Sequence, residues 1–176
     1  NKLEYIGNYL GLDISENSTG VCILENGVRD CCNIILEDIG NKEHREVLLR
    51  RALCKDLKEL LEGKQFDAII IEDVFQGTNP LTTRLLYALN TAIDELIVDG
   101  IVKCEKFMRV SNQTWKKWLF TVDKDNIAKG LGDKLKIEMC LSMLGIREIG
   151  PGYQDRLDAT GMIVGYLLNK DKIDDG

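Results

Sequence analysis

A short, nearly continuous apolar run, DAIIIE at residues 67–72, constrains the fold of this chain more than any other feature. Such a run is typical of a strand that is buried on both faces of a sheet. Three segments with strand-like alternation precede it, at residues 9–15, 21–25 and 28–37. Asn26-Gly27 is a hairpin signal between the last two. The sequence therefore predicts an antiparallel meander followed by a strand that is buried on both faces.

Segments with helical spacing of apolar residues separate and follow these strands. Asn79 and Pro80 have the side chains preferred at a helix N-cap and at the first helical position. We predict a turn at residues 16–20 and a mobile loop over most of residues 121–132, which contain Gly130 and Gly132. The predicted helices span residues 42–62, about 80–98, 112–119, 133–144 and 154–168, and a fifth strand spans residues 101–109.

This element order predicts the fold class. It is α/β: a mixed five-stranded sheet, with three antiparallel strands and then parallel additions, flanked by helices. A length of 176 residues suits a single domain spanning residues 1–176. No apolar run approaches the roughly 18 residues of a membrane span.

The cysteines and the N-terminal residues bear on localisation. None of the six cysteines forms a C-x-x-C pair, and the single histidine, His44, cannot complete a typical zinc site with them. We expect reduced, mostly buried thiols. The sequence NKLEYIGNYLGLDIS lacks the sections of a signal peptide, so we expect a cytoplasmic protein without membrane contact.

The net charge of −6 argues weakly against a nucleic-acid-binding protein. The charges are unevenly distributed, however. Residues 103–136 contain nine basic and four acidic residues, a local excess of five positive charges. This stretch is either a solvated helix face or a surface that follows phosphates, and Lys116 and Lys117 are its candidate DNA-binding residues.

Four carboxylates stand at predicted strand or helix ends. Asp13 lies in the first strand, where a buried, unpaired Asp is costly, and its side chain should point away from those of Leu12 and Ile14. Glu72 ends the apolar run, where sites form in open α/β sheets. Asp155 and Asp158 share one face near the start of the last helix. There are structural alternatives to a functional site. Asp13 and Glu72 could be ordinary charges at strand ends, and Asp155 and Asp158 could simply interact favourably with the helix dipole.

Converging carboxylates repel one another unless a cation lies between them. Hard oxygen ligands select hard cations, so Mg²⁺ is the expected ion and Mn²⁺ should substitute for it. Two such ions could activate a water molecule and stabilise a leaving oxygen in phosphodiester cleavage.

Three motifs in these places resemble those of the RuvC family of Holliday junction resolvases, which have the ribonuclease H-like fold. They are GLDISENSTG at residues 11–20, IIEDVFQGTN at 70–79 and YQDRLDATG at 153–161, and the resemblance covers about residues 9–168. It implies a homodimeric, structure-specific endonuclease that resolves four-way DNA junctions, with two metal ions per active site. Its metal ligands would be Asp13, Glu72, Asp155 and Asp158.

The resemblance also implies roles outside the carboxylates. Phe75 would be the aromatic residue that stacks into the opened junction centre; the alternative is an ordinary loop or core aromatic. Lys134, in the segment GDK, would be the catalytic lysine near the scissile phosphate and would contact DNA. The apolar helix 80–98 is a candidate dimer surface, although the same stripe could be core.

The chain departs from the family pattern at two places. Asn112 precedes Gln113-Thr114 where the family has a lysine, and either Lys116 or Lys117 could supply that charge one helical turn on. Ile14-Ser15 replaces the Pro-Gly that is common after the first Asp. These departures indicate a divergent or phage-type member.

Three other functions compete with junction resolution. A ribonuclease H-like nuclease for other branched DNA, flaps or RNA–DNA hybrids would use the same acids. An actin-like phosphotransferase shares the pattern of an Asp followed by Thr-Gly, but it needs two such domains, and this chain is too short. A catalytically silent DNA-binding module would not need all four acids.

Overall fold

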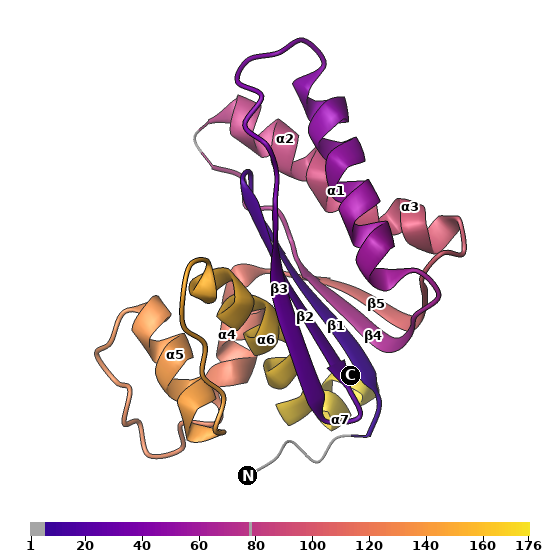
Figure 1. Cartoon of the computed structure of the whole chain (residues 1–176). Coiled ribbons are helices and arrows are strands. Elements are labelled where there is room, and N and C mark those ends of the chain that lie inside the picture. Colours follow the sequence, from indigo (N-terminus) through magenta and orange to yellow (C-terminus); the bar gives the residue numbers. More distant parts are fainter. Residues whose placement is uncertain (1–5, 78) are drawn as a thin grey trace.

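The computed structural model describes residues 6–77 and 79–176, and these contain one mixed five-stranded sheet with helices on both faces (Figure 1). The central strand β1 (Asn8–Ile14) pairs antiparallel with β2 (Ser18–Glu25) and parallel with β4 (Gln65–Glu72). The edges are β3 (Val28–Ile35) and β5 (Lys103–Val110), which gives the order β3-β2-β1-β4-β5. The predicted fold class is confirmed.

The helices divide between the two faces of the sheet (Figure 1). On one face lie α1 (Arg45–Leu61), α2 (Pro80–Asn90) and α3 (Ala92–Val98). On the other face lie α4 (Asn112–Phe120), α5 (Asp133–Met143) and α6 (Tyr153–Leu168). The chain then continues into a short helix that the sequence analysis did not predict, α7 (Lys170–Asp175).

Strand alternation decides which side chains meet which helices. Leu10 and Leu12 of β1 belong to the core under α1–α3, whereas Tyr9 belongs to the core under α4–α6. In β4, Ile71 faces α1–α3 and Ile70 faces α4–α6. Asp13 therefore shares the register of Tyr9, and Glu72 that of Ile70, so both carboxylates lie on the α6 side. As predicted, Asp13 points away from its neighbours in β1.

Two segments differ from the sequence prediction. The helix expected at 80–98 is two helices, broken at Thr91, whose hydroxyl donates to the carbonyl of Ala88 at 2.8 Å. The turn expected at 16–20 is shorter, because β2 already begins at Ser18 and Thr19 pairs with Ile14 of β1. The spacing of apolar residues reports neither the Thr91 hydrogen bond nor the Thr19–Ile14 pairing.

Residues 121–132 contain no helix or strand, as predicted, but they are anchored to the core. The buried Asp123 carboxylate accepts hydrogen bonds from the backbone N–H groups of Ile127 and Ala128, at 2.8 and 2.9 Å. Ala128 is itself fully buried. The segment is therefore a series of turns that the buried Asp123 carboxylate and the buried Ala128 side chain fix in place.

All six cysteines are free thiols, but only Cys22 and Cys140 are fully buried and the other four are half-buried. Within the described ranges, no helix is long and apolar enough to cross a membrane.

Candidate active site

Two of the four carboxylates, Asp13 and Glu72, lie at one edge of the sheet. The parallel register pairs Leu12 of β1 with Ile71 of β4, and each acid is the next residue along its strand. Asp13 is only 8% exposed, and Glu72 is half-buried. Two neighbouring strands thus deliver two carboxylates to the same end of the sheet and the same face.

Helix α6 brings the other two carboxylates to this edge, and two glycines permit its approach. A methyl group added at Gly20 of β2 would clash with the backbone carbonyl of Asp155, and one added at Gly11 of β1 would clash with that of Ala159. The α6 backbone therefore rests directly on the sheet. This close packing is what places Asp155 and Asp158 beside Asp13.

Electrostatics show that the four acids form one group. Burial raises the pKa of Asp13 well above its usual range, and the negative charges of Asp158, Glu72 and Asp155 raise it further. Burial also raises the pKa of Asp158 to about 7, with Glu72 and Asp155 adding to the effect. A side-chain hydrogen bond between the two carboxyl groups adds to the raised pKa of Asp13 and lowers that of Asp158. The carboxylates are close enough to repel one another.

The donor set, four carboxylates, suits a hard divalent cation. In the described part of the chain, no three His, Cys, Asp or Glu side chains are arranged tightly enough to hold an ion. The observation in favour of a cation is that the negative charges of neighbouring acids, together with burial, raise the pKa values of Asp13 and Asp158 at this edge. A divalent cation would remove that repulsion, and oxygen ligands suit Mg²⁺ and Mn²⁺.

Two lysines border the carboxylates. Lys134, at the start of α5, lines a small cavity of about 130 Å³ together with Asp155 and Asp158. Lys116, on α4, lowers the pKa of Asp158 through its positive charge and forms a 3.2 Å ion pair with Asp133. Lys117 is exposed and lines a neighbouring hollow. Lys116 and Lys117 were the two candidates to replace the family lysine that is absent at Asn112. Of these two, Lys116 is the one whose charge acts on a carboxylate of the site.

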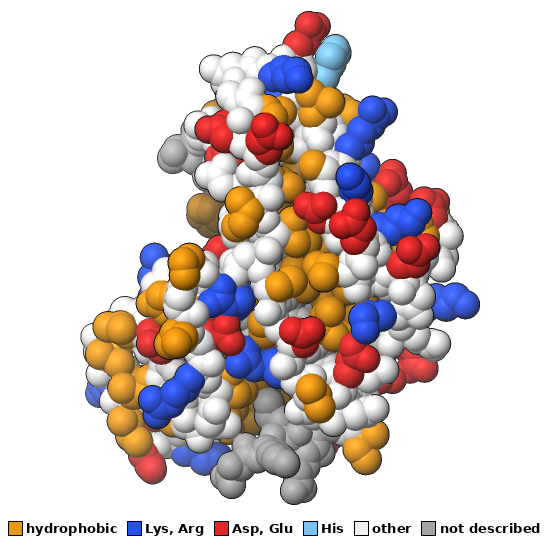
Figure 2. Space-filling model, viewed as in Figure 1, with side chains coloured by type: hydrophobic (Ala, Val, Ile, Leu, Met, Phe, Trp, Pro, Cys, Tyr) orange, Lys and Arg blue, Asp and Glu red, His pale blue; other side chains and the backbone are white. Residues whose placement is uncertain are grey.

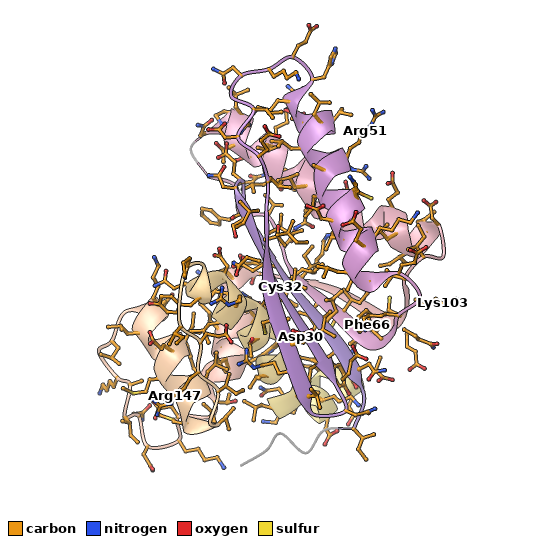
Figure 3. All side chains as sticks on the ribbon, in the orientation of Figure 1. Asp30, Cys32, Arg51, Phe66, Lys103 and Arg147 are labelled. Atoms are coloured by element: carbon orange, nitrogen blue, oxygen red, sulfur yellow. The ribbon has the colours of Figure 1, made fainter. Side chains whose placement is uncertain are left out.

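The basic stretch 103–136 does not form one surface. Lys103 begins β5 at the end of the strand away from α4, and Figure 3 shows it at the opposite side of the molecule from α5. Lys106 and Arg109 form ion pairs with Asp174 and Asp94. On the face shown in Figure 2, acidic and basic side chains are interspersed. Within this stretch, Lys116 of α4 and Lys134 of α5 are the basic residues that lie against the carboxylates.

Phe75 projects from the loop after β4 and is 81% exposed. The alternative that it is a core aromatic is therefore wrong. It lines a groove of about 820 Å³ that also contains Glu72 and Asn112. The groove begins at the carboxylate edge and runs towards α2, so an exposed aromatic face lies beside the candidate site. Thr78, in the same loop, lies outside the described residues.

Sequence reasoning missed two partners of Glu72. Asn112 Nδ2 and Trp115 Nε1 both donate to Glu72 Oε1, at 2.6 and 2.7 Å. In the sequence, Asn112 stands out only as a departure from the family pattern. Trp115 did carry a signal, because a buried indole N–H usually needs an acceptor, but the sequence does not say which acceptor.

No family model and no curated protein matches the sequence. Solved structures do match the fold. A Thermus thermophilus RuvC in complex with a Holliday junction substrate has a TM-score of 0.59 at 11% identity, covering 96% of each chain. A second Thermus thermophilus RuvC structure has a TM-score of 0.52 at 13% identity, covering 94% of this chain and 96% of that one.

The yeast mitochondrial Holliday junction resolvase Ydc2 also matches, with a TM-score of 0.56 at 15% identity, covering 95% of this chain and 80% of that one. These identities are too low to carry function across. They show that the chain has the ribonuclease H-like fold in the form found in RuvC and Ydc2.

Proposed function

We propose that this chain is a metal-dependent endonuclease that resolves four-way DNA junctions. The observation that carries the proposal is the meeting of four carboxylates at one buried edge, on a fold that resembles solved junction resolvases over nearly the whole chain. In a protein that only bound DNA, four negative carboxylates at one edge would repel one another and the DNA phosphates without any benefit to binding.

The carboxylates Asp13, Glu72, Asp155 and Asp158 would hold two Mg²⁺ ions. When bound, the ions supply an activated water molecule and stabilise the leaving oxygen. Lys134 faces two of these acids across the small cavity, where its ammonium group can neutralise a non-bridging phosphate oxygen. Lys116 adds positive charge from the α4 side, and Lys117 can contact a neighbouring phosphate.

Junction selectivity would come from Phe75. Its exposed ring can stack on a base that becomes unpaired at the crossover, and the adjoining groove can receive the strand that leads to the carboxylates. Two copies acting across one junction would cut two strands, so we propose a homodimer.

Most of the apolar stripe of α2 and α3 packs in the core, where Leu85, Leu89, Ile93 and Leu96 are buried, so we place a dimer contact elsewhere. Leu81 and Tyr87 of α2 remain exposed and are available for such a contact.

The proposal is tested by incubating the protein with a labelled four-way junction, a flap, a fork and an RNA–DNA hybrid, each with Mg²⁺, Mn²⁺ or EDTA. We expect metal-dependent cleavage of the junction in preference to the others. Faster cleavage of flaps or hybrids would support the broader nuclease alternative. Metal-dependent binding without any cleavage would identify a binding module.

Asp13→Asn is the matched control. It removes one proposed ligand and one repelling charge, so the variant should fold and bind junctions while cleaving at least about 100-fold more slowly. Near-normal cleavage by this variant would exclude the proposed site.

A further inference from the structure

Both hydrogen bonds to the Glu72 side chain fall on the same oxygen. Asn112 Nδ2 and Trp115 Nε1, one helical turn apart on α4, donate to Oε1 at 2.6 and 2.7 Å. Among residues 6–77 and 79–176, no group donates a hydrogen bond to Oε2. The two donors thus fix the rotation of the carboxylate and leave one oxygen available.

The backbone of Glu72 is held as well. Its carbonyl accepts a 2.9 Å hydrogen bond from Asn90 Nδ2, and Asn90 Oδ1 in turn accepts a 2.6 Å hydrogen bond from Arg109. Asn90 is only 4% exposed. With its backbone and one carboxylate oxygen both anchored, Glu72 has little freedom to turn Oε2 elsewhere.

Trp115 also connects Glu72 to the helix that carries the other acids. Its side chain is fully buried and lies against Gly161 of α6, where an added methyl group would come within 2.9 Å of the indole Cζ3. One side of the indole therefore packs on α6 while its N–H donates to the acid at the end of β4. The same ring contacts both Glu72 and the helix that carries Asp158.

Neutral donors suit a metal ligand better than a cation would in this position. An amide and an indole orient the carboxylate without cancelling its charge, so Oε2 keeps its full attraction for a divalent ion. Hydrogen-bond partners of this kind typically change metal affinity by about 10–100-fold when they are removed.

We propose that Trp115 and Asn112 are positioning residues that occupy Oε1 of Glu72 and so present Oε2 to a divalent cation at the β4–α6 junction. This inference rests on the proposed metal-dependent function.

The contact itself can be tested without metal or DNA. The chain has two tryptophans, so the ¹H–¹⁵N spectrum of the folded protein contains two indole resonances. A hydrogen bond to a carboxylate should move the Trp115 indole proton downfield. Glu72→Gln replaces the charged acceptor and should shift this resonance back, while that of Trp118 stays in place as the internal control. If the chemical shift of the Trp115 indole proton were the same in Glu72→Gln as in the wild type, the inference would be overturned.

The positioning role is tested by calorimetric titration with Mg²⁺ alone. Trp115→Phe keeps an aromatic ring against Gly161 but removes the N–H, and Asn112→Leu removes the amide at similar volume. We expect each to weaken Mg²⁺ binding by about 10-fold or more, and Trp118→Phe, the control on the same helix, to leave it unchanged. Because Asn112 is partly exposed, Asn112→Leu provides the measurement even where Trp115→Phe fails to fold.

The outcomes separate the two proposals. Wild-type Mg²⁺ binding that neither variant weakens would overturn the positioning role and leave the proposed function standing. Failure of the wild-type protein to bind Mg²⁺, with the indole shift present, would overturn the metal-dependent function and the role given to Oε2, while the hydrogen bond would remain.

Discussion

At the scale of single residues, Phe75 separates junction cleavage from nuclease activity in general. Its ring is 81% exposed in a loop three residues after Glu72. Phe75→Ala should slow cleavage of intact four-way junctions, because stacking on one base is worth about 1–3 kcal/mol, or roughly 5- to 150-fold in rate. A junction already unpaired at its centre should be cut almost normally, since it needs no wedge to open it.

Single-turnover cleavage of the two substrates, measured side by side, gives the comparison. The matched control is Val98→Ala, which shortens another exposed apolar side chain, at the end of α3 and outside the proposed site. Equal losses of rate on both substrates after Phe75→Ala would remove the residue-level support for junction specificity.

Cys31 is a second residue with a testable environment. A hydrogen bond from Cys22, followed by contacts with Thr160 and Arg29, lowers its pKa to about 6 although burial opposes this. Because this pKa lies below the usual value, the thiolate predominates at neutral pH. Alkylation of Cys31 by iodoacetamide should therefore rise from about pH 5 to 7 and then level off.

The other half-buried thiols provide the internal reference. Burial raises the pKa values of Cys54 and Cys104, so their alkylation should still be increasing above pH 9. Peptide mapping by mass spectrometry follows each thiol separately. Arg29→Gln should move the Cys31 inflection to higher pH, and an unchanged inflection would exclude the arginine as a cause.

At the scale of elements, α4 lies beside the carboxylates, whereas Lys106 and Arg109 of β5 are engaged in ion pairs with Asp174 and Asp94. Replacing Lys116 and Lys117 by Gln should weaken junction binding and reduce the salt slope by up to about two ions. The measurement is fluorescence anisotropy between roughly 50 and 200 mM salt, in the Asp13→Asn background so that the DNA stays intact.

Lys103→Gln is the control for this measurement, since Lys103 begins β5 far from α4 (Figure 3). It should leave the slope unchanged. If the double α4 variant also had the wild-type slope, α4 would simply be a solvated helix face.

At the scale of the whole molecule, folding brings together four charges that the unfolded chain keeps apart. A divalent cation that binds only the folded state should stabilise it by about 2.7 kcal/mol at a concentration 100-fold above its dissociation constant. For a chain of this length we expect Tm to rise by roughly 5–10 °C. Thermal melts in MgCl₂ and in NaCl of equal ionic strength make the comparison.

Asp13→Asn should lose most of this Mg²⁺-dependent rise, because one ligand is gone. A rise of equal size in NaCl would show general screening of charge instead of a bound ion.

The sequence alone was sufficient to predict the sheet and which acids share an edge of it. The alternation of Leu10 and Leu12 assigned Asp13 to the opposite face, and the apolar run before Glu72 identified a strand that is buried on both faces. These features are local, since side-chain direction in a strand follows residue parity. The spacing of apolar residues did not predict the helix break at Thr91 or the anchoring of residues 121–132 by Asp123, because both depend on individual hydrogen bonds.

Only the tertiary structure decided how the acids are held. The approach of α6 depends on Gly11 and Gly20, whose missing side chains admit a helix more than 130 residues away in sequence. The donors to Glu72 come from α4, and the basic stretch divides between β5 and the helices. Each of these features is a contact between segments that are distant in the chain. Residue spacing reports which face a side chain occupies, whereas packing determines what that face meets.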